Sequence, residues 1–205
     1  MTMPQADGQL APAAVRARGD APWQDLDRRQ MLELAVPGIA IGVLCGIITG
    51  GALAAGGLAL DVALFAGVTL ALPLAFAGGC FELLLARGRF PLSALTPVVL
   101  FWAVAFPIAR ILHAAVLDLY AGEAVAVPNG WLGFIVYQML LSVAFGIGYW
   151  WLHENFAPRW WYHVRDRNPV AAQYMGVLID HVVATEQRNS RRGKRRRKSH
   201  RESGG

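Results

Sequence analysis

The chain has 205 residues, of which 55% are hydrophobic and only 16% are charged, against a charged share of about 25% in typical soluble domains. The charged residues crowd into positions 1–34 and 153–205, and the mean hydropathy is +0.38. This distribution excludes an ordinary soluble helical domain, because such a domain needs polar faces that repeat every three to four residues, and the long middle has none. We therefore expect an all-α integral membrane protein.

Residues 1–34 form a polar segment that we expect to lie in the cytoplasm and to be disordered up to about residue 19. Asp20-Ala21-Pro22 predicts a capped helix that leads into the first apolar segment. Arg28-Arg29 mimics a twin-arginine export signal, but such a signal precedes a single moderately apolar stretch and a soluble domain. We therefore favour a cytoplasmic flank with a helix before the membrane.

Four apolar segments follow, at residues 36–57, 62–86, 96–117 and 131–152, and each has the roughly 20 residues that cross a bilayer. They predict a domain of four transmembrane helices over residues 35–152. Cys45 and Cys80 lie inside these segments without a CxxC spacing, which favours a packing role over a disulfide or a metal site.

In the first two segments a small residue recurs at every fourth position, which is the pattern of a glycine zipper. Close backbone contact favours helix association in lipid, so we expect a tight hairpin of the first two helices. Alternatively, the same face packs between copies of the chain in a homo-oligomer or docks a larger partner. The packing positions are Gly38, Gly42, Gly46 and Gly50 in the first segment, and Ala63, Gly67, Ala71, Ala75 and Gly79 in the second.

Arg110 interrupts the apolar run of the third segment, and His113 follows one helical turn later on the same face. Tyr137 and Gln138 of the fourth segment reach a similar depth, and Asp118 lies near the outer end of the third. These five residues are the candidate intramembrane polar cluster. We favour a helix-bonding role for Arg110 over contact with an anionic solute, because no second intramembrane charge lines a path.

The sequence favours neither a cofactor nor a metal ion. Haem would need two axial histidines at similar depth, but His113 lies in the outer half of the membrane and His153 at the inner end of the fourth segment. HENFA, which begins at His153, lacks the second histidine of the zinc-binding HExxH motif. We expect no catalytic residue, no cofactor-binding residue and no metal ligand.

Residues 153–190 predict cytoplasmic helices that lie on the membrane surface or dock a partner. The aromatic and basic segment 159–165 is suited to the headgroup level, with its rings facing inward. Asn168-Pro169 predicts the cap and first turn of an amphipathic helix over residues 168–188. Its apolar side consists of Ala171, Tyr174, Met175, Leu178, Ile179 and Val182.

Residues 191–205 predict a disordered polybasic tail, with eight Lys or Arg among residues 191–201. Such a segment gains about 1 kcal/mol per basic residue near an anionic leaflet. We expect anionic lipids of the cytoplasmic leaflet as partners, together with a membrane protein or a second copy. Contact with nucleic acid would be nonspecific, and the nearby leaflet is favoured over it. The basic residues are Arg191, Arg192, Lys194, Arg195, Arg196, Arg197, Lys198 and Arg201.

Basic residues alternate along the chain. Four lie in residues 1–34, two near 87–95 and twelve in 153–205, while the connections near 58–61 and 118–130 have none. The positive-inside tendency then places both termini in the cytoplasm. The Ala, Gly and Arg-rich composition suggests a bacterial inner (plasma) membrane.

Our leading interpretation of function is a non-catalytic accessory or scaffold component of an inner-membrane assembly. Its polybasic tail would dock anionic lipid or a partner. One alternative is an oligomeric channel or small transporter for an anionic solute that uses Arg110. Another is a membrane enzyme or redox subunit that uses His113.

Overall fold

The structure is a computed structural model that describes residues 26–126 and 130–202. Five helices follow one another: α1 (Arg28–Ala55), α2 (Leu60–Ala86), α3 (Leu95–Tyr120), α4 (Gly130–Val164) and α5 (Pro169–Glu202). The described residues contain no strand. Helices α1 to α4 are each long and apolar enough to cross a membrane. The predicted all-α class and the four apolar helices are therefore confirmed.

The start of α1 is set by a cap at Asp27. The expected helix start at Asp20 and the expected disorder before residue 19 lie outside the described residues. The helix begins at Arg28 because Asp27 caps it. The Asp27 carboxylate accepts a hydrogen bond from the backbone N of Gln30 at 2.7 Å, and the Gln30 side chain accepts one from the backbone N of Asp27 at 3.1 Å.

The fourth and fifth helices also extend further than predicted. Helix α4 continues to Val164 and contains Pro158, so the aromatic and basic segment 159–165 prolongs the fourth helix. Helix α5 is continuous to Glu202, although we expected disorder from residue 191. Arg and Lys are strong helix formers, which explains how a charge run prolongs a helix. The side chains of residues 189–202, including the eight basic residues of 191–201, lie outside the description.

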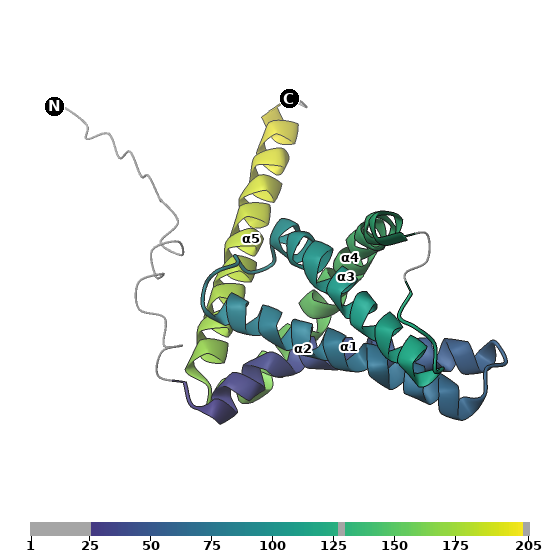
Figure 1. Cartoon of the computed structure of the whole chain (residues 1–205). Helices are drawn as coiled ribbons and strands as arrows, with labels where there is room; N and C mark the ends of the chain where they lie inside the picture. The colour runs from purple at the N-terminus through teal and green to yellow at the C-terminus, as the bar shows by residue number, and fades with distance from the viewer. Residues whose placement is uncertain (1–25, 127–129, 203–205) are drawn as a thin grey trace.

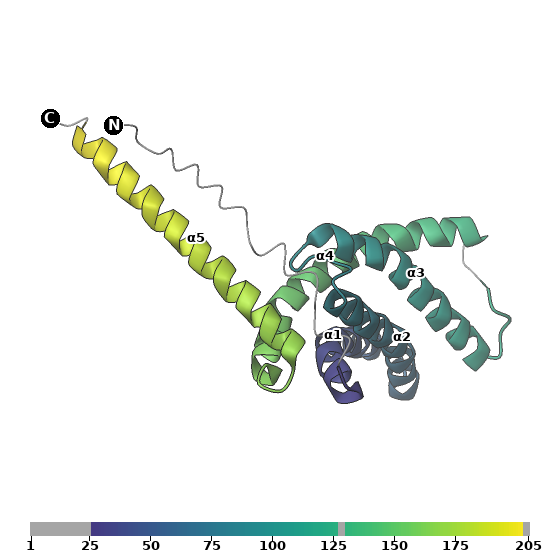
Figure 2. The same cartoon turned by 90° about the vertical axis from the view of Figure 1, so that its left-hand side faces the viewer.

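Helices α1 and α2 lie side by side as an antiparallel pair, while α3 and α4 cross each other and diverge toward the end of α3 and the start of α4 (Figure 1). Helix α1 contacts α4, and α2 contacts α3 from the Phe81–Phe101 rings near one end to the Phe65–Tyr120 rings near the other. Figure 2 looks along α1 and α2, and α5 runs sideways from them. The buried core between these helices includes Leu34, Phe81, Trp102, Tyr149 and Trp161.

Glycines bring the backbones of α1 and α2 together. A Cβ atom at Gly38 would overlap the backbone of Gly78, and one at Gly42 would overlap the backbone of Ala75. One at Gly46 would lie 2.6 Å from the carbonyl oxygen of Gly67. The contact therefore leaves no room for larger residues at these positions. Further small residues along it are Gly50, Ala63, Ala71 and Gly79.

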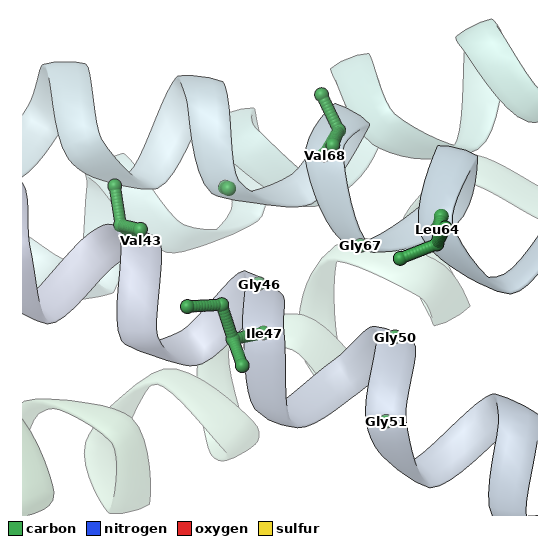
Figure 3. A pocket seen from close by; sticks show the side chains of 9 residues that line it. Val43, Gly46, Ile47, Gly50, Gly51, Leu64, Gly67 and Val68 are labelled. Carbon is green, nitrogen blue, oxygen red and sulfur yellow. The ribbon is translucent and has the colours of Figure 1, made fainter.

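An apolar groove of about 330 Å³ lies on the outer side of the same contact (Figure 3). Gly46, Gly50 and Gly67 line it without side chains, while Ile47 and Leu64 border it. Both of these apolar side chains are exposed. The glycines thus serve the helix contact and also leave a shallow depression beside it.

A buried glutamate and histidine pair as the candidate functional site

Glu82 and His153 meet inside the protein at the junction of α2 and α4. Glu82 lies in the last turns of α2, and His153 lies in the second half of α4. Nε2 of His153 is 2.9 Å from Oε1 of Glu82, and the two side chains are only 7% and 1% exposed. Removing two such groups from water is costly, and their close approach offsets part of that cost. The pair therefore connects the two helices through a buried polar contact.

A second carboxylate approaches the same histidine. Oε1 of Glu154 lies 3.9 Å from Nδ1 of His153, and Ser93 donates a hydrogen bond from Oγ to Oε2 of Glu154 at 2.8 Å. Ser93 lies in the connection between α2 and α3 with φ of 61°, a conformation that costs free energy for a residue other than glycine. Because the hydroxyl bonds to Glu154 and not to His153, these residues do not form a nucleophile and base relay.

Aromatic rings enclose His153. The ring centroids of Phe81, Tyr149 and Trp161 lie 5.9, 6.0 and 5.5 Å from the centroid of its imidazole. Trp161 in turn contacts Tyr174 of α5, with 4.7 Å between centroids. Burial raises the pKa of the Tyr174 hydroxyl, and the Glu82 carboxylate adds to the rise. The first turns of α5 thus cover the Glu82–His153 pair.

The position of Trp161 differs from the sequence expectation. We placed the rings of segment 159–165 at the headgroup level, yet Trp161 is only 1% exposed and packs inside the protein. Tyr162 is exposed, and the guanidinium carbon of Arg165 lies 3.7 Å from the centroid of its ring. The segment therefore directs Trp161 into the core and Tyr162 to the surface, because it belongs to a helix with an inward face.

The start of α1 binds the turn between α4 and α5. Pro37 has no N–H, so the carbonyl of Glu33 lacks its usual partner within α1. Trp160 donates a hydrogen bond from Nε1 to this carbonyl at 2.6 Å. The carboxylate of Glu33 accepts one from Nε of Arg167, also at 2.6 Å. The carbonyl that Pro37 leaves without a partner in α1 is thus satisfied by a side chain of α4.

Gln30 and Asn168 complete this contact. The side chain of Gln30 donates to the carbonyl of Arg167 at 2.8 Å, and Nδ2 of Asn168 donates to the carbonyl of Gln30 at 2.9 Å. Oδ1 of Asn168 accepts a hydrogen bond from the backbone N of Ala171 at 3.3 Å, which confirms the predicted cap of α5. We call Gln30, Glu33, Trp160, Arg167 and Asn168 the α1–α5 junction.

The structure brings only part of the predicted polar cluster together. Nδ1 of His113 lies 3.0 Å from Oγ1 of Thr69 on α2. Half-buried Arg110 is within electrostatic range of His113 and Tyr137. Asp118 instead accepts a hydrogen bond from the backbone N of Ala126 at 3.0 Å, in the connection after α3.

The two residues from the fourth segment have different environments. Gln138 is buried, and its Oε1 has no hydrogen-bond partner in the part of the chain that the structure describes. Tyr137, its neighbour, is 59% exposed. Successive residues of a helix point about 100° apart, so both side chains could not turn to the same contact.

Sequence reasoning missed the Glu82–His153 pair. It considered His153 only as a haem or zinc ligand and did not pair it with Glu82. A usable signal was present, since both residues lie toward the ends of the apolar segments that we expected to face the cytoplasm. In the described residues, no group of three His, Cys, Asp or Glu is arranged to hold a metal ion.

No protein-family model, no curated protein and no solved structure matches this chain.

Proposed function

We propose that this protein is a non-catalytic accessory or scaffold component of an inner-membrane assembly, and that α5 is its docking element. The observation that carries the proposal is the contrast between the two ends of α5. Its base is held by the α1–α5 junction. Further along, Ile179 and Val182 are apolar and 53% and 62% exposed. A helix fixed at its base, with an apolar surface beyond it, is suited to binding something outside the bundle.

The use of polar groups inside the bundle supports a non-catalytic role. Glu82 contacts His153, and His113 contacts Thr69. Transport paths and catalytic centres need ionisable groups that face a solute or a substrate. Here His113 and His153 are each engaged with a partner from the same chain.

The proposal includes a rigid α1–α2 hairpin and two cytoplasmic termini. The backbone contact through Gly42 and Ala75 supports the rigid hairpin. Arg29 and Arg89 lie at one end of the first two helices, while Asp61 lies at the other, which supports the orientation. In a variant without Cys45 and Cys80, a membrane-impermeant maleimide should label Glu123→Cys in intact spheroplasts and should not label Arg89→Cys.

The assembly can be tested by isolating the full-length chain from its own membrane in a mild detergent and measuring the mass of the complex. We expect the 22.3 kDa chain to be recovered with a membrane protein at fixed stoichiometry. The Glu33→Ala/Arg167→Ala variant, which loosens the α1–α5 junction, should reduce that recovery. Exposed Arg159→Ala is the matched control. Recovery of a free monomer from the wild-type membrane would contradict the proposal.

One observation favours a second candidate function, the passage of an anionic solute. Arg110 forms no ion pair in the described part of the chain. Asp118, the acidic member of the predicted cluster, instead accepts a hydrogen bond from the backbone N of Ala126. An intramembrane arginine without an acid is suited to an anion. Flux measurements, described in the Discussion, separate this function from the first.

A further inference from the structure

We infer that α5 lies on the cytoplasmic surface of the bilayer as an interfacial helix, and that anionic phospholipid is its partner. This inference rests on the proposed function, because it names what the docking element binds.

The direction of α5 is the first argument. In Figure 1, α1 and α2 extend across the view and α5 rises from one end of the pair. Figure 2 looks along α1 and α2 and shows α5 running sideways from them. A bilayer that α1 and α2 cross has its surface in this same sideways direction. With 34 residues, α5 is about 50 Å long, so most of it extends past the bundle.

The apolar face of α5 is the second argument. Ala171 and Tyr174 are buried against the bundle at the base of the helix. Leu178 and Val182 continue the same face, because residues spaced by three or four positions share one side of a helix. Val182 is exposed, so the face that packs on protein at the base has no protein cover further along. A straight helix keeps this face directed to the side where the bundle lies, which is also the side of the surrounding lipid.

Charge is the third argument, and it decides between partners. The exposed apolar residues are followed by eight Lys or Arg among residues 191–201. An apolar stripe beside a basic run is the composition of helices that lie in the headgroup region of anionic membranes. Nucleic acid would neutralise the basic run but would leave Ile179 and Val182 in water. A bilayer surface accommodates both features together.

The test measures the depth of two spin labels in the full-length protein, reconstituted without Cys45 and Cys80. One label replaces Val182 on the apolar face, and the matched control replaces Ala184, which lies on the opposite side of the same turn. Both positions are exposed in the structure. Vesicles contain phosphatidylcholine with or without phosphatidylglycerol, and accessibility to oxygen and to a water-soluble nickel complex reports depth.

With phosphatidylglycerol, we expect Val182→Cys to be accessible to oxygen and Ala184→Cys to nickel, so the ratio of the two accessibilities reverses between the positions. Phosphatidylcholine alone, or Gln at residues 195–198, should reduce this difference. Equal exposure of both labels to nickel in every vesicle would overturn the inference. So would dipolar broadening between labels, since it would show that a second copy covers this face.

The two proposals fail separately. If both labels stay in water while a membrane protein is still recovered at fixed stoichiometry, the lipid-bound α5 is wrong and the accessory function stands. If the Val182 label enters lipid but the chain is always recovered as a monomer, the lipid-bound α5 stands and the accessory function is wrong.

Discussion

Glu82 and His153 lie 2.9 Å apart, Oε1 to Nε2, in a site that α5 covers through the contact between Tyr174 and Trp161. The polar contact between α2 and α4 therefore lies directly beneath the base of the proposed docking element. Loss of this pair should therefore lower the stability of the bundle and alter the position of α5.

Substitution of either partner should destabilise the protein. We expect Glu82→Gln and His153→Gln each to lower the free energy of unfolding by about 3–5 kcal/mol, because each leaves the other side chain buried without its partner. The double variant should lose much less than the sum. Unfolding of the detergent-solubilised protein by increasing SDS, followed by circular dichroism, measures these differences. Exposed Glu123→Gln is the control, and additive losses would contradict the predicted coupling.

The glycine contact predicts opposite effects for two substitutions in the same helix. Gly42→Ala should destabilise the hairpin by about 1–3 kcal/mol, because the added Cβ meets the backbone of Ala75. Gly51→Ala should be neutral or stabilising by up to about 1 kcal/mol, since nothing lies within 4 Å and alanine favours the helix. The same SDS titration measures both. Equal effects at the two positions would show that α1 and α2 do not pack through this face.

The link between Pro37 and Trp160 can be tested by a double-mutant cycle. Trp160→Phe removes the donor to the Glu33 carbonyl and should cost about 1–3 kcal/mol. In a Pro37→Ala background, the backbone N of residue 37 can bond to that carbonyl, so the cost should be smaller. Thermal unfolding in detergent gives the four stabilities. An identical cost in both backgrounds would mean that the indole contributes only packing.

Arg110 provides the test of the second candidate function. If the protein passes an anionic solute, Arg110→Gln should reduce chloride or phosphate flux in proteoliposomes at least tenfold, because it removes the positive charge that an anion would meet in the membrane. Arg89→Gln, in a connection outside the apolar helices, is the control and should retain flux. If the wild-type protein shows no flux of either anion, this candidate fails and the accessory function is favoured.

Long apolar runs and the cap of α5 were predictable from the sequence. Twenty or more apolar residues can satisfy their backbone in lipid only as a helix, so the four apolar helices followed from composition alone. The Asn168 cap of α5 followed from a local dipeptide. The packing glycines such as Gly42 were recognisable because small residues at every fourth position lie on one face of a helix.

Contacts between distant segments were not predictable in the same way. Glu82 and His153 are 71 positions apart (153 − 82), and their meeting depends on which helices adjoin and at what depth. The environment of Trp160 depends on a carbonyl that Pro37 leaves free in another helix. The end of α5 was misjudged for a different reason, since a run of Lys and Arg has both the composition of disorder and a high helix propensity.

The proline in α1 has a consequence for biosynthesis. The acceptor that it creates at Glu33 finds its donor 127 residues later, at Trp160. During insertion into the membrane, this carbonyl therefore cannot bond to Trp160 until α4 has left the ribosome. Completion of the α1–α5 junction is thus a late event of synthesis, and a nascent chain truncated before Trp160 cannot reach it. In this protein α4 supplies the donor that α1 lacks at Glu33.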